Sequence, residues 1–232
     1  MKGEEKKVHL RNGQIQVYCD ICRKINFDNC IFVMNNEKKW AVIKITTGQM
    51  VTEYKYTKFN EVVLPNVIIK NGLACSVCDK DGKWGALNSK GNEIIECKYD
   101  ICKVINPDYA IVGIENNYGV LNKQAEQIIP VNYKNIIQEI FKGFFIVSQE
   151  NGDGIIDKKG NVIIPCIYTE LYIGDKGNWL VKNNEDNYLL YDGNGNIINQ
   201  NISIMNCYKN EINKQDEEIF SPINIFKHVV KS

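Results

Sequence analysis

Two pairs of cysteines have the spacing of zinc and redox sites. Cys19 and Cys22 are separated by two residues, and so are Cys75 and Cys78. Two such pairs could supply the four thiolates of a tetrahedral zinc site, and one pair could exchange a disulfide. However, 52 residues lie between the two pairs, far more than a zinc ribbon has. We therefore predict structural cysteines and no metal site.

A second candidate is the acidic stretch that begins at Asp192. Asp192-Gly-Asn-Gly-Asn196 follows the first half of a calcium-binding loop. Such a loop next requires glycine and later closes with an acidic ligand, but this chain has Ile197 and Ser203 at those places. The stretch is therefore interpreted as a turn between two strands.

Nucleophilic catalysis lacks its usual residues. Histidine, the commonest general base, occurs only as His9 and His228, near the two ends of the sequence. Neither is accompanied by a nucleophile elbow or a phosphate-binding glycine loop. We expect exposed histidines, no cofactor and no enzymatic activity.

The elements that would position any site follow from a repeat of roughly 35 residues. Tyrosine occurs eight residues after a turn residue in four copies, and seven or eight residues before that turn stands a second anchor, usually aromatic. Glycine follows this second anchor in three of five copies. The expected anchors are Trp40, Tyr56, Trp84, Gly85, Gly91, Tyr99, Tyr118, Gly119, Tyr133, Gly154, Gly160, Tyr168, Tyr188 and Gly195, with Gly48 and Ala125 in the remaining turn positions.

Each repeat also contains a short apolar run rich in β-branched and aromatic residues, bounded by Asn, Gly and Asp. Such runs indicate strands, and Asn and Gly favour the tight turns between them. Each unit is predicted to be a three-stranded antiparallel meander. The predicted units are about 30–62, 72–105, 108–137, 143–172 and 178–203, preceded by a fragment at 1–24, so that the array occupies 1–210.

These residues resemble the bacterial WG repeat family. Its pattern of Trp-Gly, a Lys-Gly turn, Ile-Ile-Pro and Tyr is matched best by Trp84-Gly85 with Gly91 and Tyr99, and nearly as well by Gly154 with Gly160 and Tyr168. Trp40 lacks the following glycine, and the copy around Tyr188 has lost most of its second half. The resemblance implies an all-β repeat array that mediates interactions, and says nearly nothing about what is bound.

A single meander of this size has too little core to stand alone, so units must stack on their neighbours. The anchors are then expected to pack between units, and the glycine to admit a neighbouring backbone or ring. Either a closed propeller-like ring or an open β-solenoid satisfies this requirement. We favour the ring, because the N-terminal fragment could pair with the incomplete last unit.

Two segments depart from the repeat. An apolar insertion at 61–69 offers Leu64, Pro65, Val67 and Ile68 as candidate binding residues, since insertions often lie on the binding face of a repeat protein; an extra strand pair in the core is the alternative. In the segment 211–232, Ser221 and Pro222 could begin a short helix with Ile223, Phe226 and Val230 on one face. That helix would cap the last repeat or dock a partner.

The overall composition excludes several classes of protein. Lys plus Arg and Asp plus Glu each total 28, so the net charge is zero and no nucleic acid is expected as a partner. No run of residues is apolar enough for a membrane span, and Met1 begins no signal peptide. We expect a cytoplasmic protein whose nine cysteines are reduced.

The leading hypothesis is therefore a scaffold that binds another protein through loops at one end of the array. A glycan or small metabolite, stacked between repeats on Trp40, Trp84, Tyr118 or Trp179, is the second hypothesis. The third is an immunity protein that neutralises a cognate toxin.

Overall fold

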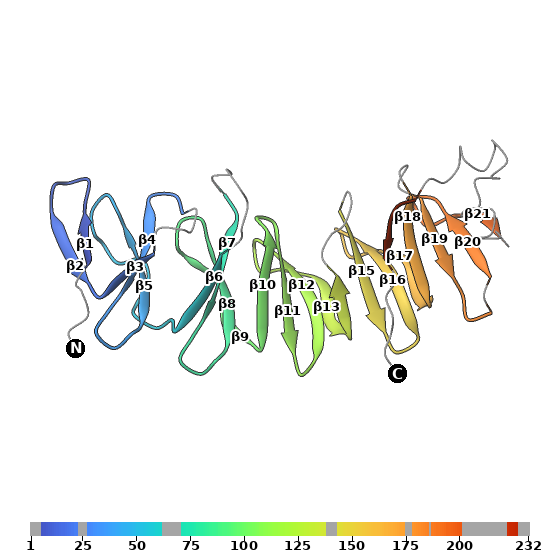
Figure 1. Ribbon diagram of the computed structural model, residues 1–232, viewed down its shortest axis with the longest axis horizontal. Coiled ribbons are helices and arrows are strands. Elements are labelled where there is room, and N and C mark those ends of the chain that lie inside the picture. Colours follow the sequence, from blue (N-terminus) through green and yellow to red (C-terminus); the bar gives the residue numbers. More distant parts are fainter. Residues whose placement is uncertain are drawn as a thin grey trace. The chain divides into compact units, whose positions relative to one another are not determined.

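The computed structural model describes residues 6–22, 27–61, 71–137, 143–174, 178–185, 187–200 and 222–226. All regular elements among these residues are β-strands (Figure 1). In chain order they are β1 (Lys6–His9), β2 (Ile15–Tyr18), β3 (Asp20–Cys22), β4 (Cys30–Met34), β5 (Trp40–Lys44), β6 (Lys58–Glu61), β7 (Leu73–Cys78), β8 (Trp84–Asn88), β9 (Glu93–Tyr99), β10 (Ile101–Asn106), β11 (Tyr109–Ile114), β12 (Asn117–Asn122), β13 (Gln127–Tyr133), β14 (Asn135–Ile137), β15 (Phe144–Gln149), β16 (Gly152–Asp157), β17 (Val162–Tyr168), β18 (Glu170–Gly174), β19 (Trp179–Lys182), β20 (Tyr188–Tyr191), β21 (Ile197–Gln200) and β22 (Pro222–Phe226).

These strands form six small sheets, which we number in chain order. Sheet I is β1-β2, sheet II β3-β4-β5, sheet III β6-β7-β8-β9, sheet IV β10-β11-β12-β13, sheet V β14-β15-β16-β17, and sheet VI β21-β20-β19-β18-β22. The chain divides into two compact units, Met1–Asn132 and Tyr133–Ser232. The all-β repeat architecture is confirmed, whereas the choice between a ring and a solenoid stays a prediction.

Sheets III, IV and V each have four strands, one more than the predicted meander. The extra strand begins two residues after the repeat tyrosine and starts the next sheet, so Tyr99 ends β9 and Ile101 starts β10. Between them, the Asp100 N–H donates to the carbonyl of Gly113 at 2.9 Å, which fixes the entry into sheet IV. The extra strand has no constant residue from repeat to repeat, so comparing the repeats did not reveal it.

The predicted turn positions are confirmed by the backbone. Gly91 and Gly160 have φ values of +81° and +88°, and Ala125 adopts +63° in the same place. Asx turns hold these hairpins: the side-chain oxygen of Asn122, for example, accepts the N–H groups of Gln124 and Glu126, each at 2.9 Å. An L-residue in this left-handed region is uncommon, and the hydrogen-bonded turn holds Ala125 there.

Steric contact explains why glycine follows the aromatic anchor. A Cβ atom on Gly85 would lie 2.3 Å from the carbonyl oxygen of Ile95, and one on Gly154 would lie 2.5 Å from that of Ile164. In both places the pairing with the third strand of the unit shifts register. Sheet II has Ala41 in this position, and there the third segment makes only isolated bridges, from Trp40 to Tyr56 and from Ile43 to Met50. The glycine therefore permits the third strand.

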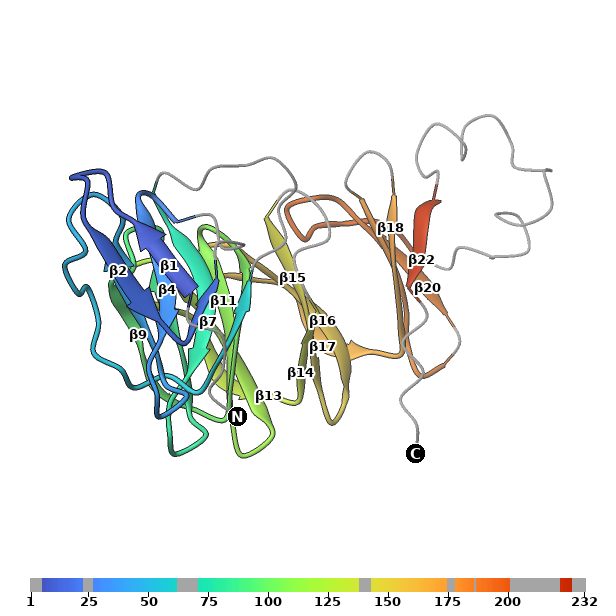
Figure 2. The ribbon, with the colours of Figure 1, turned by 60° about the vertical axis from the view of Figure 1, so that its left-hand side comes forward.

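The core lies between facing sheets within each unit. Clusters of buried side chains join sheets I and II, II and III, and III and IV in the first unit, and sheets V and VI in the second. Figure 2 shows β4, β7 and β11 of successive sheets side by side. The repeat tyrosines Tyr56, Tyr99, Tyr133 and Tyr168 are all buried, as expected for packing residues.

The predicted C-terminal helix is wrong where the structure describes the segment. Residues Pro222–Phe226 form β22, which pairs antiparallel with β18, with Leu171 opposite Phe226. Alternating β-branched residues suit a strand, and the edge of β18 offers backbone partners that a short isolated helix would lack. Ser221 and Val230, which belonged to the same prediction, lie outside the described residues.

Candidate binding clefts

The four predicted binding residues of the insertion lie outside the described residues: Leu64, Pro65, Val67 and Ile68. Their role stays a prediction.

The cysteine pair in β7 does not form a metal site. Cys75 and Cys78 are three residues apart on one strand, so their side chains point to opposite faces of sheet III, and both are buried. Across the described residues, no group of three or more His, Cys, Asp or Glu side chains could hold a metal ion. Burial also raises the pKa of the Cys102 thiol to about 12, which keeps it protonated at neutral pH.

The predicted turn at Asp192 is confirmed, and of the two histidines predicted to be exposed, His228 lies outside the described residues. Asp192 accepts the backbone N–H groups of Asn194 and Asn196 at 2.9 and 2.8 Å, and the Asn196 side chain donates to its second oxygen at 2.9 Å. These bonds, led by the one from the Asn196 side chain, lower the pKa of Asp192. The carboxylate closes a turn, as the sequence indicated. His9 is exposed.

The aromatic rings proposed as ligand platforms differ in their surroundings. Trp179 is 1% exposed and meets Phe144 edge-on, with ring centroids 5.5 Å apart. Trp40 packs edge-on against Phe59 at 5.1 Å in the contact between sheets II and III. Trp179 is a core residue, and Trp40 is a partly buried ring packed against the core. Trp84, in contrast, lines a pocket between sheets III and IV.

A polar contact also joins sheets II and III. Tyr56 donates its hydroxyl hydrogen to Glu93 at 2.6 Å, and the Lys55 ammonium group lies 2.6 Å from the same oxygen. Burial disfavours the charge on Glu93, but the hydrogen bonds from Lys55 and Tyr56 outweigh it and lower the pKa of Glu93 below its usual value.

The variant Glu93→Gln should therefore be less stable at neutral pH, by about 1 kcal/mol. Because the folded-state pKa of Glu93 is lowered, its contribution is complete above the unfolded value of about 4.3 and disappears as the pH falls through the folded value. Urea unfolding at pH 7 and pH 3 should show a smaller pH effect in the variant than in the wild type. Equal pH effects in the two proteins would show that the contacts of Glu93 do not contribute to the pH dependence of stability.

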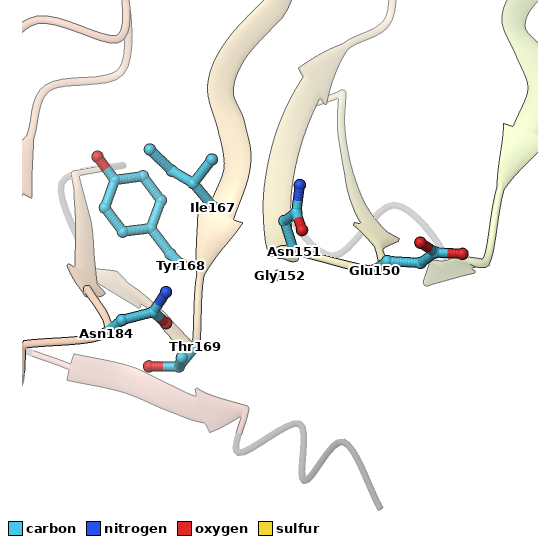
Figure 3. Close-up of a pocket in the computed structure, with 7 residues that line it drawn as sticks. All are labelled: Glu150, Asn151, Gly152, Ile167, Tyr168, Thr169 and Asn184. Atoms are coloured by element: carbon cyan, nitrogen blue, oxygen red, sulfur yellow. The ribbon is translucent and has the colours of Figure 1, made fainter. Parts of the chain in front are cut away.

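The largest opening that we describe lies in the second unit, between the turns of sheets V and VI (Figure 3). We call it the turn-end cleft. Its volume is about 720 Å³, and its lining residues are Glu150, Asn151, Gly152, Ile167, Tyr168, Thr169 and Asn184. Figure 3 shows Ile167 beside Tyr168 and Asn184 beside Thr169, with the turn of Glu150 and Asn151 opposite them.

Two lining residues of the turn-end cleft, Tyr168 and Gly152, are fixed by contacts within the second unit. The Tyr168 hydroxyl is hydrogen-bonded to that of Tyr191 at 2.5 Å, which links sheet V to sheet VI. Burial, together with this bond, raises the pKa of Tyr168. A Cβ atom on Gly152 would lie 2.5 Å from the Tyr168 carbonyl oxygen, so the turn sits directly on the tyrosine backbone. The cleft is therefore preformed.

The corresponding place in the first unit is closed by charged groups. Between sheets III and IV, Lys83 lies 2.7 Å from Asp100, whose other oxygen accepts the N–H of Glu115 at 2.9 Å. The repeat places Gly152 where Lys83 would be and Thr169 where Asp100 would be. The second unit has no such bridge at the turn-end cleft. Aligning the repeats by their tyrosines could have revealed this difference.

The second opening, which we call the Trp84 pocket, lies in the first unit. Its volume is about 480 Å³, and it is lined by Asn60, Ser76, Trp84, Ile101, Cys102, Lys103 and Val104. Of the ring positions proposed from the sequence, this one combines an aromatic side chain with an opening.

The described part of the chain contains no helix that is long and apolar enough to span a membrane. No curated protein matches the sequence. Solved structures with a similar arrangement include Hsv2 of Kluyveromyces lactis (8% identity, 75% of this chain and 61% of that chain covered, TM-score 0.33) and BamB of Moraxella catarrhalis (12%, 76% and 62%, TM-score 0.30). The WD40 β-propeller domain of Doa1 is another (9%, 81% and 71%, TM-score 0.28). This chain spans about three fifths of the length of Hsv2 and BamB.

The sequence also matches a family model in two places. Residues 84–118 and 154–175 match the WG containing repeat. The first region runs from Trp84 in sheet III to Tyr118 in sheet IV, and the second runs from Gly154 in sheet V into sheet VI. The matched regions include Gly85 and Gly154, which face the bulged third strand.

Proposed function

We propose that this chain, which carries WG repeats, is a non-catalytic module that binds a segment of another protein in the turn-end cleft. The observation that carries the proposal is the opening itself. The first unit bridges the corresponding place with Lys83 and Asp100, and the second unit leaves it open.

The lining of the turn-end cleft suits a peptide. Asn151 and Asn184 are exposed and carry amide groups that both donate and accept hydrogen bonds, as peptide groups do. Ile167 is 50% exposed and supplies an apolar contact beside them. Interfaces between proteins combine apolar contacts of this kind with a polar rim. A partner segment with one apolar side chain and an unpaired stretch of backbone would fit these groups.

The experiment compares two glutamate variants of β17. Ile167→Glu places a charge in the turn-end cleft, whereas Val162→Glu places one on the same strand outside the cleft lining, where Val162 is 59% exposed. The tagged wild-type protein and both variants would be purified from the native host, and a recovered partner would be titrated by calorimetry. We expect at least a tenfold weaker affinity for Ile167→Glu, since the charge must be desolvated at the contact, and no change for Val162→Glu.

Unchanged affinity in the Ile167→Glu variant would place the binding surface elsewhere. A co-purifying small molecule, with no protein partner, would contradict the proposal of a protein-binding module. Equal unfolding midpoints for the two variants would show that the loss of binding is not a loss of fold.

A further inference from the structure

The Trp84 pocket is formed by the facing surfaces of sheets III and IV. Asn60 on β6 stands opposite Ser76 on β7, and Trp84 on β8 stands opposite Cys78, two residues farther along β7. Cys102 and Val104 face them from β10. All four strands belong to the first unit, so the pocket is contained in one compact body.

Comparison of the repeats shows why a pocket exists here. In each sheet from II to VI, a valine of the second strand pairs with a residue of the first strand. The residue before that valine is large and apolar in four sheets and is Ser76 in sheet III; the five residues are Phe32, Ser76, Ile111, Ile146 and Leu180. The first-strand residue opposite the valine is Cys102 in sheet IV and is larger elsewhere; the five are Ile21, Phe59, Cys102, Ile136 and Leu171.

The contact between sheets II and III serves as an internal control. There, Phe32 occupies the position of Ser76, and Phe59 occupies that of Cys102. Their rings stack with centroids 4.4 Å apart and planes 5° from parallel, and Trp40 meets Phe59 edge-on. The same place is therefore filled by phenyl rings. Between sheets III and IV, a hydroxymethyl group and a thiol replace both rings and leave the space beside Trp84 open.

The groups that line this space are polar as well as aromatic. The Ser76 hydroxyl accepts the N–H of Val104 at 3.1 Å and, like any hydroxyl, still carries a proton to donate. Asn60 is exposed and shares the Ser76 face of sheet III, so its amide group is available at the pocket. Lys103 lines the pocket from β10, between Cys102 and Val104. Small-molecule sites combine a largely apolar lining with a few such polar groups, in volumes of roughly 300–1,000 Å³.

An aromatic ring together with a few polar groups indicates which class of ligand the pocket could bind. A phosphate group would call for arginine or several cations, and Lys103 is the one cationic residue among the described lining residues. A purely apolar ligand would cover the exposed Asn60 amide without offering it a hydrogen bond. A sugar ring has an apolar C–H face for the indole of Trp84 and hydroxyl groups for the amide of Asn60 and the hydroxyl of Ser76. We propose that the Trp84 pocket binds one sugar ring of a saccharide, stacked on Trp84.

The test titrates the full chain with free hexoses and N-acetylhexosamines, using tryptophan fluorescence and calorimetry. Trp179 is buried, Trp40 packs against Phe59 in another contact, and neither lines the pocket, so a saturable change in emission should report on Trp84. The variant Ser76→Phe introduces the residue of sheet II and should abolish binding, with a lower unfolding midpoint because the Val104 N–H loses its acceptor. Asn60→Ala, at an exposed position, should weaken binding at least tenfold and leave the fold intact. Val162→Glu, in the other unit, should bind as the wild type does.

Two results would overturn the proposal: no saturable response of the wild type to any sugar of the panel, or full binding by both Ser76→Phe and Asn60→Ala. A response to inorganic phosphate without a response to sugars would also overturn it. The variant Ile167→Glu separates this site from the turn-end cleft. It should lose the protein partner and keep the sugar, so either function can fail without the other.

Discussion

Replacing Phe32 with alanine is expected to destabilise the protein by about 3–5 kcal/mol. Phe32 is fully buried, stacks on Phe59 and contacts the rings of Phe27 and Trp40. Its removal would leave a cavity at the centre of the contact between sheets II and III. The variant also loses the aromatic pairing with Phe59, which contributes about 0.5–1.5 kcal/mol beyond the buried area.

The change is measured by urea unfolding, with Ile15→Ala as the matched control. Ile15 is 53% exposed on sheet I, so its truncation should change the free energy of unfolding by less than about 0.5 kcal/mol. A Phe32→Ala variant as stable as the control would mean that the sheets do not depend on this contact.

The second large effect is expected for Gly154→Ala. The added methyl group would lie 2.5 Å from the Ile164 carbonyl oxygen and 2.8 Å from the Cys166 nitrogen, both backbone atoms of β17. Because backbone cannot rotate away as a side chain can, β17 must shift from β16. We expect a loss of about 3 kcal/mol, the upper part of the range for overpacking.

The matched control for this variant is Ala41→Gly, in the same repeat position of sheet II. There the third segment already makes only isolated bridges, so the change should cost about 1 kcal/mol or less, the usual difference between glycine and alanine in a strand. Thermal unfolding of both variants checks the contrast. Similar losses would show that glycine is not required by the approach of the third strand.

The sequence predicted the hairpins well because their signals are local. A turn residue with a positive φ must be glycine or a residue held by a turn, and even Ala125 was placed correctly from its distance to Tyr133. The repeat tyrosines were correctly interpreted as packing residues. The first strand of each sheet was missed, because its side chains vary with the neighbour they pack against, as Phe59 and Cys102 illustrate.

The openings were beyond the sequence because each depends on pairs of residues far apart in the chain. The pair of Lys83 and Asp100 and the pair of Gly152 and Thr169 can be aligned by the repeat tyrosines, but only the structure shows that Lys83 and Asp100 are in contact and that a cleft lies at Gly152 and Thr169. Likewise, Trp179 and Trp84 look alike in sequence, and only the packing shows that the first ring is core. The prediction of a C-terminal helix failed for the same reason, since β22 pairs with β18, which lies about 50 residues earlier in the sequence.

The order of the strands also bears on how the protein folds. Within sheets I to V every paired strand neighbours its partner in sequence, and β18 with β22 in sheet VI is the one pair among the described strands that is not consecutive. Such low contact order favours fast folding, since each hairpin closes a short loop at small entropic cost. We therefore expect the hairpins to form early and β22 to join last. A missing or altered repeat would then slow only the steps that its own hairpins control.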